Sequence, residues 1–175
     1  MGETHDNLWA PWRMEYIHSL SGDAESDGCF FCRYIEHPEQ DQAHHVIWRS
    51  AHGVVLMNRY PYTNGHLMVA TRRHVGDPAT LEEAELVGLT RLTYQAVALL
   101  RRVLDPQGFN VGANLGQCAG AGVPGHLHHH IVPRWNGDTN FLSTLAGTRV
   151  IPQSLDALYE QLVGAAREMG VVGPS

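Results

Sequence analysis

The sequence predicts a single α+β domain over residues 1–175, built from an antiparallel sheet of about five strands, one long helix and a C-terminal helix. Short apolar stretches bounded by turn residues predict the strands, and two longer stretches with apolar residues at helical spacing predict the helices. A hydrophobic content of 43% in 175 residues is enough to bury one core.

The N-terminal 28 residues divide into an aromatic arm and a flexible segment. Residues 8–17 contain two tryptophans, a tyrosine and a proline, and we expect an ordered arm that lies on the domain or on a partner subunit. Residues 19–28 are rich in Ser, Gly and Asp and are expected to be flexible. We find no signal-peptide core and no stretch suited to a membrane span, and the low, odd cysteine count indicates a reducing, cytoplasmic environment.

Three strands are expected in the first half of the chain. Residues 46–48 and 54–57 lie on either side of a turn, and residues 66–70 follow a loop at 58–65 that contains Pro and Asn-Gly.

A long helix is predicted over residues 80–104, with Thr80 as its N-cap and Glu83 closing a capping box. A strand at 109–115 and a Gly/Ala-rich loop at 116–125 follow, and then a histidine-rich strand. Residues 151–169 predict the terminal helix, opened by Pro152 near its first turn.

The charge composition excludes several kinds of function. A net charge of −6 argues against a protein that binds nucleic acid through a basic surface. All 12 basic residues are arginine, which excludes Schiff-base chemistry, lysine–nucleotide ligation and a P-loop lysine. Any phosphate must therefore be held by Arg, His, amide, hydroxyl or backbone N–H groups.

The strongest chemical signal lies at residues 125–134, which read GHLHHHIVPR. In an extended strand His126, His128 and His130 point to one face, and the residues between them point to the other. Three imidazoles on one face make a reactive surface, because histidine gives and takes protons near neutral pH. A solvent-facing polar strand is the alternative, but the Gly-rich loop before the strand favours a site.

This strand resembles the His-φ-His-φ-His-φ-φ signature of the histidine triad (HIT) superfamily, except that His129 occupies one apolar φ position. Residues 55–61 and 65–69 resemble the nucleotide-binding half of that family. Residues 108–116 and 132–141 are similar to the branch containing dinucleoside polyphosphate hydrolases and diadenosine tetraphosphate phosphorylases. The resemblance implies a HIT-like fold.

The resemblance also implies catalytic roles. His128 would be the nucleophile that attacks an α-phosphate and forms a covalent nucleotidyl-imidazole intermediate, with its second nitrogen bonded to the backbone carbonyl of His126. His130 would hydrogen-bond the phosphate oxygens, and loop amides would stabilise the developing charge. The residues implied in substrate binding are Asn58 at the ribose and His66, Asn114, Gly116, Gln117 and Gly122 at the phosphates.

One departure from the family pattern concerns the leaving group. Many relatives carry Gly-Gln-Ser/Thr before the triad, and the hydroxyl assists the leaving group. This chain has Ala-Gly-Val-Pro-Gly at residues 121–125, so Gln117 or backbone amides would have to take that part.

A second constellation is Cys29-Phe30-Phe31-Cys32. One CxxC supplies only two ligands of a tetrahedral site, and a pair of packing cysteines is the alternative. Zinc-containing relatives complete such a site with two distant histidines, whose positions here are His74 and His126. A structural Zn²⁺ would staple the N-terminal segment to the catalytic strand. His44 and His45 are rival ligands.

The first hypothesis is therefore an enzyme that hydrolyses or transfers the nucleotidyl group of dinucleoside polyphosphates or related conjugates, without an organic cofactor. A phosphorylase that uses inorganic phosphate as acceptor is the alternative, and a zinc-catalysed hydrolase or a non-catalytic nucleotide-binding protein are less favoured. We expect a nucleotide substrate and a homodimer, with no nucleic-acid or membrane partner.

Overall fold

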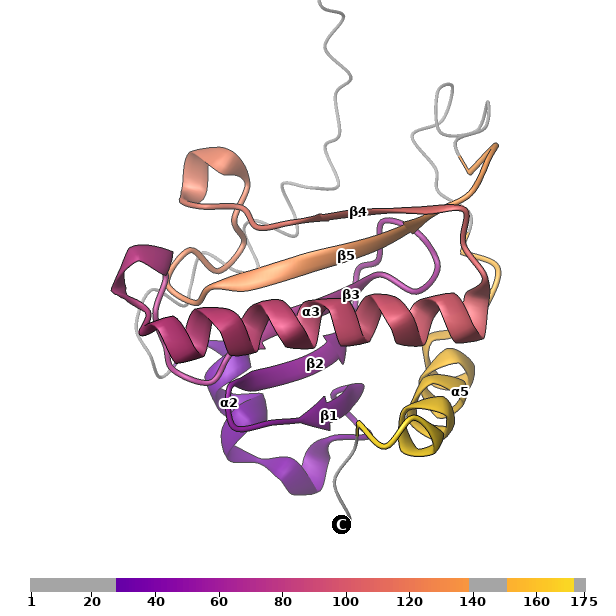
Figure 1. Cartoon of the computed structure of the whole chain (residues 1–175), viewed down its shortest axis with the longest axis horizontal. Coiled ribbons are helices and arrows are strands. Elements are labelled where there is room, and N and C mark those ends of the chain that lie inside the picture. The colour runs from indigo at the N-terminus through magenta and orange to yellow at the C-terminus, as the bar shows by residue number, and fades with distance from the viewer. Residues whose placement is uncertain (1–27, 139–150, 172–175) are drawn as a thin grey trace, which may run out of the picture.

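A five-stranded antiparallel sheet forms the centre of the computed structural model, which describes residues 28–138 and 151–171. The strand order is β1-β2-β3-β5-β4, so β1 and β4 are the edges (Figure 1). The strands are β1 Val46–Arg49, β2 Gly53–Met57, β3 Leu67–Thr71, β4 Gly108–Gly112 and β5 His128–Arg134. The predicted α+β class is confirmed.

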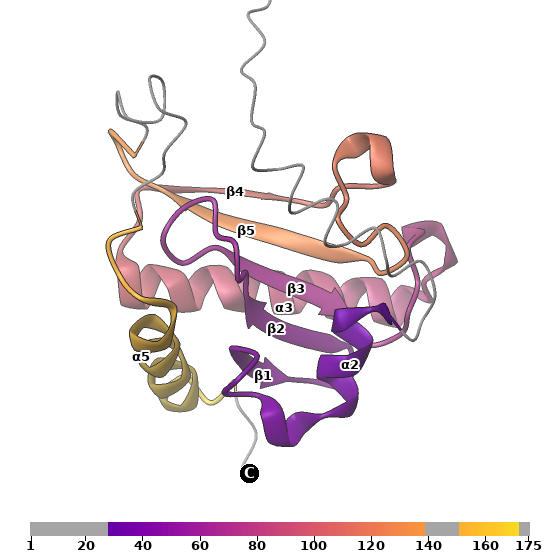
Figure 2. The ribbon, with the colours of Figure 1, turned by 180° about the vertical axis from the view of Figure 1, so that it is seen from behind.

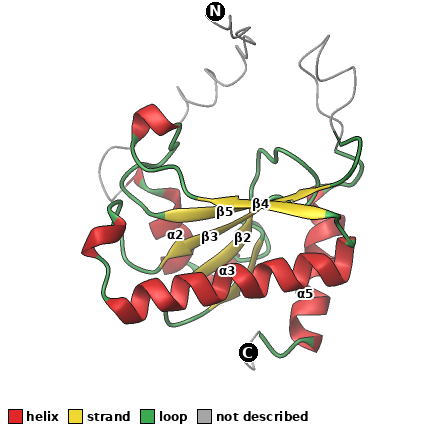
Figure 3. Ribbon diagram, turned by 45° about the horizontal axis from the view of Figure 1, so that its top comes forward, coloured by secondary structure: helices red, strands yellow, loops and turns green. Residues whose placement is uncertain are grey.

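Helices cover both faces of the sheet. Helix α3 (Glu83–Leu104) runs along one face, with α5 (Leu155–Glu168) beside it (Figures 1 and 3). The short helix α2 (Phe30–Glu36) lies on the opposite face, over β1 to β3 (Figure 2). Both faces of the sheet bury apolar side chains. Because successive side chains of a strand point to opposite faces, both sets lie in a packed interior.

The pairing of β3 with β5 decides which face each histidine occupies. His128 lies opposite Ala70 and His130 opposite Met68, and both partners belong to the cluster under α2. His129 lies opposite Val69, which faces α3. Because directly paired residues share a face, the predicted alternation of the triad is confirmed for β5. His126 precedes the first residue of this strand.

The start of α3 differs from the prediction. Thr80 ends a separate 3₁₀ turn at Pro78–Thr80, in which Asp77 Oδ1 accepts from Ala79 N–H at 2.9 Å. The N-cap of α3 is Glu82, whose N–H donates to Glu85 Oε2 at 3.0 Å. The predicted capping box at Thr80 and Glu83 is therefore wrong by two residues, because the Asp-Pro step closes its own turn first.

Two other boundaries differ from the prediction, and one helix was not predicted. Strand β4 ends at Gly112 instead of residue 115. Helix α5 begins at Leu155 with Ser154 as N-cap, whose Oγ accepts from Ala157 N–H at 3.3 Å, so Pro152 lies outside it. Helix α2, unexpected from the sequence, spans only seven residues.

Arg49 at the end of β1 holds α2 in place. Its guanidinium donates to the backbone carbonyl of Ile35 at 3.0 Å and also to that of Tyr34, which are groups at the C-terminal end of α2. The Asp41 carboxylate accepts from Arg49 Nε at 2.9 Å. The carbonyls at the end of α2, which lack partners within the helix, therefore bind an arginine whose charge Asp41 balances. These hydrogen bonds fix α2 against the sheet.

The predicted arm at residues 8–17 and all but the last residue of the segment at 19–28 lie outside the described residues. Among the helices that are described, none combines the length and apolar character needed to cross a membrane.

Candidate functional site

His128 begins β5 and is 5% exposed. Its Nδ1 lies 2.7 Å from the backbone carbonyl oxygen of His126. A carbonyl can only accept, so Nδ1 carries the proton and donates. Burial lowers the pKa of His128, which keeps the ring neutral and leaves a lone pair on Nε2. This is the tautomer that a nucleophilic imidazole requires.

His130 stands two residues further along the same face. Its ring centroid lies 5.0 Å from that of His128, and its Nδ1 lies 3.0 Å from Nε2 of His66. His66 is 1% exposed and precedes β3. Burial, followed by the neighbouring histidines, lowers the pKa of His130 to about 4, so its ring is neutral near pH 7. The predicted association of His66 with the triad is present in the geometry.

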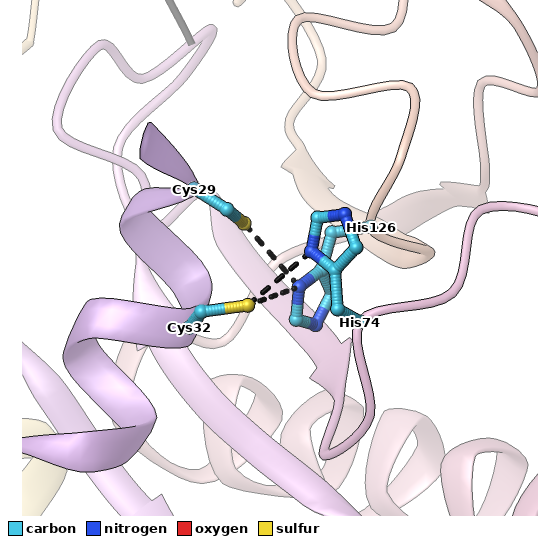
Figure 4. Close-up of side chains that lie close together, drawn as sticks. All are labelled: Cys29, Cys32, His74 and His126. Atoms are coloured by element: carbon cyan, nitrogen blue, oxygen red, sulfur yellow. Dashed lines mark hydrogen bonds between the residues drawn. The ribbon is translucent and has the colours of Figure 1, made fainter. Parts of the chain in front are cut away.

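Four potential metal ligands meet beside the triad: Cys29, Cys32, His74 and His126 (Figure 4). Their ligand atoms all lie within 4.8 Å of one another. Nδ1 of His126 is 3.4 Å from Cys29 Sγ and 3.5 Å from Cys32 Sγ, and Nδ1 of His74 is 3.3 Å from Cys32 Sγ. The sequence predicted this set, and the fold brings it together.

The four potential ligands are positioned by different elements of the fold. Cys29 caps α2 and Cys32 lies in its first turn, so both thiols lie at the same end of the helix. His74 follows β3, and His126 leads into β5, the strand paired with β3. Nε2 of His126 donates to the backbone carbonyl of Thr71 at 2.7 Å, which leaves Nδ1 unprotonated and facing the thiols.

The donor set fits a closed tetrahedral zinc site. Ligand atoms about 2.0–2.3 Å from a tetrahedral Zn²⁺ lie about 3.3–3.8 Å apart, which is close to the three separations above. Burial and the neighbouring Cys29 raise the pKa of Cys32 to about 12, so a deprotonated pair needs a bound cation. The rivals lie elsewhere: His44 stacks on Tyr34 at 3.9 Å, and His45 bonds Asp156 at 2.8 Å.

The HIT domain family model matches residues 39–137. This chain belongs to the HIT family. An AP-4-A phosphorylase of Mycobacterium tuberculosis is 39% identical over 151 residues, covering 85% of this chain and 77% of that protein. The asymmetrical bis(5'-nucleosyl)-tetraphosphatase of Schizosaccharomyces pombe is 30% identical over 93 residues, covering 53% and 50%.

The fold of this HIT protein also matches solved structures. A Zn-bound histidine triad family protein from Mycobacterium smegmatis superposes with a TM-score of 0.67 at 24% identity, covering 84% of this chain and 99% of that one. The C. elegans NitFhit protein gives a TM-score of 0.57 at 28% identity, covering 71% and 27%. The HIT-like fold expected from the resemblance is confirmed.

His129, the residue that departs from the HIT signature, has a structural partner. Its Nδ1 lies 2.9 Å from Thr93 Oγ1 on α3, and the Thr93 hydroxyl donates to the Leu89 carbonyl at 2.8 Å. The hydroxyl proton is thereby used, so Nδ1 of His129 donates to Thr93. His129 replaces an apolar contact with a hydrogen bond between the catalytic strand and α3.

The remaining predicted residues of this HIT protein lie around the triad in different states. Asn58 is 5% exposed and bonded to Tyr60 and His66. The Asn114 side chain donates to the Gly120 carbonyl at 3.2 Å and so closes its own loop. Gly116 has φ +83°, a left-handed conformation that glycine adopts without strain. Gln117 is exposed, and Gly122 follows the buried Ala121.

Two aromatic residues lie at the site that the sequence analysis did not predict there. The ring of Phe31, fully buried, lies 4.8 Å from His128 and 5.1 Å from His126. The ring of Tyr62 lies 4.6 Å from His66, and its N–H donates to His66 Nδ1 at 3.1 Å. Phe31 lies inside the CxxC motif, and Tyr62 lies in the loop before His66. These sequence positions are the signals that could have placed both residues at the site.

Proposed function

We propose that this HIT protein cleaves dinucleoside polyphosphates or related nucleotide conjugates at the α-phosphate, through a covalent intermediate on His128. The observation that carries the proposal is the hydrogen bond from His128 Nδ1 to the His126 carbonyl, which leaves Nε2 as a buried, neutral nucleophile. The names of the curated relatives, AP-4-A phosphorylase and bis(5'-nucleosyl)-tetraphosphatase, support the same substrate class.

The first step forms a bond between Nε2 of His128 and the α-phosphorus. The bond from that phosphorus to its bridging oxygen breaks, and the departing phosphate takes the electron pair. The Nδ1–H bond to the His126 carbonyl stabilises the positive charge that the ring acquires. His130 donates to a non-bridging oxygen, and amides of the loop from Gly116 to Gly122 stabilise charge at phosphorus.

The second step returns His128 to its starting state. A water or a phosphate attacks the phosphorus, the N–P bond breaks, and the electron pair returns to Nε2, while an attacking water releases one proton to the solvent. Asn58 and Asn114 are our candidates for further contacts with the ribose and the phosphates. Each carboxamide has a second N–H and a second lone pair, so a contact with substrate leaves its present hydrogen bonds in place.

The nucleophile is tested with His128→Ala. We expect kcat for a diadenosine polyphosphate to fall at least about 10³-fold while substrate binding persists, because the variant lacks the imidazole that would carry the nucleotide. Mass spectrometry of quenched wild-type protein should show a nucleotidyl adduct that survives alkali better than acid and is absent from the variant. The exposed His37→Ala is the matched control. Full turnover by His128→Ala would exclude the mechanism.

A phosphorylase is the second candidate, because the curated relative that matches 85% of the chain carries that name. The two activities differ only in the acceptor for the second step. Water yields a nucleoside monophosphate, whereas inorganic phosphate yields a nucleoside diphosphate. Product analysis with phosphate omitted and then added separates them. A protein that binds the nucleotide and forms neither product would be a binding protein only.

We also propose that Zn²⁺ occupies the cluster of Cys29, Cys32, His74 and His126. The Cys₂His₂ donor set supports a closed structural site, and a zinc-bound relative of the same fold adds support. When bound, the ion supplies a rigid cross-link and not a reactive water. Catalytic zinc on the triad is disfavoured, because His126 Nδ1 faces the thiols while His128 Nδ1 bonds a carbonyl.

We infer a homodimer, joined at the β4 edge. The last three residues of β4 are exposed, with Val111 43% exposed, and Tyr94 on α3 is 65% exposed. Among the described residues no strand pairs with the outer edge of β4, and an unpaired edge that carries an exposed apolar side chain such as Val111 favours association with a second copy. The free thiols of Cys29 and Cys32 favour a reducing, cytoplasmic location.

A further inference from the structure

The segment from Asn58 to His66, which joins β2 to β3, contains a chain of directed hydrogen bonds. The carboxamide of Asn58 is 5% exposed, and its Oδ1 accepts from the Tyr60 N–H at 2.9 Å. A backbone N–H can only donate, which fixes the orientation of the carboxamide. The Nδ2 group, a donor, therefore faces Nδ1 of His66 at 3.3 Å.

A second donor reaches the same nitrogen. The Tyr62 N–H lies 3.1 Å from His66 Nδ1. Two N–H groups that converge on one ring nitrogen require it to accept, so neutral His66 carries its proton on Nε2. That proton is donated across 3.0 Å to Nδ1 of His130. His130 must then carry its own proton on Nε2.

We propose that Asn58 is a positioning residue, acting through His66 to make His130 a hydrogen-bond donor at Nε2. The catalytic consequence rests on the proposed function, in which His130 meets a phosphate oxygen. An anionic oxygen needs a donor there, whereas the opposite tautomer of His130 would aim a lone pair at it. Burial, which lowers the pKa of His130 to about 4, makes the choice between neutral tautomers decisive.

The neighbouring histidine shows why an external device is needed. His128 carries its proton on Nδ1, bonded to the His126 carbonyl, and presents a lone pair at Nε2. His130, 5.0 Å away on the same strand, requires the opposite arrangement. Two equivalent rings on one strand take opposite tautomers only because their Nδ1 partners differ. For His130 that partner is His66, which is set by the loop that begins at Asn58.

The experiment is NMR of the full chain with ¹⁵N-labelled histidine, in which one-bond and two-bond couplings assign the protonated ring nitrogen. In the wild type we expect Nε2–H for His66 and His130 and Nδ1–H for His128. Asn58→Asp keeps the oxygen that accepts from Tyr60 and replaces the donor with an acceptor of equal size. We expect the charged carboxylate to prevail over the Tyr62 N–H, which still points at Nδ1, so that the proton of His66 moves to Nδ1 and the proton of neutral His130 follows.

The change should also alter catalysis. At about pH 8, where imidazoles are mostly neutral, we expect kcat of Asn58→Asp to fall about tenfold or more, with KM changed less. The matched control is Asn64→Asp, which adds the same charge to the same loop and should keep the wild-type tautomers.

Two results would overturn the proposal. One is a wild-type protein in which His130 carries Nδ1–H, a measurement that needs no variant and stands even if Asn58→Asp does not fold. The other is a folded Asn58→Asp protein with unchanged tautomers. Because the spectra do not depend on turnover, a wild type that cleaves no dinucleoside polyphosphate would defeat the proposed function and leave the tautomer test intact.

Discussion

Each ring of the three triad histidines has different hydrogen-bond partners. His126 bonds the Thr71 carbonyl through Nε2 and turns Nδ1 toward the two cysteines. His128 bonds the carbonyl of His126, and His130 accepts from His66. One residue, His126, therefore serves both sites: its side chain belongs to the Cys₂His₂ cluster, and its backbone carbonyl fixes the tautomer of His128, the proposed nucleophile.

Protonation of His130 should make stability depend on pH. Its pKa is about 4 in the folded protein and 6.5 in the reference state, so between these values the unfolded chain binds a proton that the folded chain does not. The contribution of neutral His130 to the free energy of unfolding is fully present above pH 6.5 and is lost as the pH falls toward 4. At pH 5 the loss is on the order of 2 kcal/mol.

His130→Asn should remove this decrease in the free energy of unfolding. The Oδ1 of the asparagine can still accept a hydrogen bond from His66, and an asparagine does not titrate. Urea unfolding at pH 7 and pH 5 measures the change, and the exposed His37→Asn is the matched control. Equal pH dependence in His130→Asn and wild type would contradict the lowered pKa.

At the scale of elements, the seven-residue helix α2 is held by groups outside it. Arg49 binds the carbonyls at the C-terminal end of α2, and Phe31 packs against the rings of His126 and His128. The two cysteines at the N-terminal end of α2 belong to the Cys₂His₂ cluster. A helix this short has little stability of its own, so its place depends on these tertiary contacts.

Loss of the metal should therefore loosen α2 and the catalytic strand together. We expect wild-type protein to contain about one zinc ion per chain, and Cys29→Ser to lose it. A loss of several kcal/mol would lower Tm by about 10 °C or more. Zinc content and thermal unfolding measure the effect, and the exposed Cys118→Ser is the control. A zinc-free wild type of equal stability would refute the structural site.

At the scale of the whole molecule, the two edges of the sheet differ: among the described residues, α5 packs beside the β1 edge, and no strand pairs with the outer edge of β4. α5 packs on α3 and β1, whereas β4 has its last three residues exposed. Strand β5, which carries His128 and His130, pairs directly with β4, so the triad lies next to this edge strand, with Gly112 of β4 opposite His130.

If two copies join at β4, a charge placed there should separate them. Val111→Arg is expected to convert the dimer to a monomer at micromolar concentration, because a buried unpaired charge opposes association. Light scattering after size exclusion measures the mass, and Gln161→Arg, exposed on α5, is the matched control. A wild type that is monomeric at all concentrations would disprove the interface.

The sequence alone determined the features that depend on local periodicity and on residue chemistry. Alternation along β5 placed His128 and His130 on one face, and helical spacing located α3, whereas His74 and His126 were joined to the CxxC motif only through the resemblance to zinc-containing relatives. Signals of this kind survive folding because a strand or helix imposes its period wherever it packs. The arm at residues 8–17 stays a prediction, since it lies outside the described residues.

Only the tertiary structure decided which partner each polar group meets. Helix α2 was too short to show a period, and the N-cap of α3 moved from Thr80 to Glu82 because Asp77 closed a competing turn. His129 meets Thr93, 36 residues away, and His130 meets His66, 64 residues away. Tautomers and metal sites depend on such long-range contacts, and the sequence does not encode them locally.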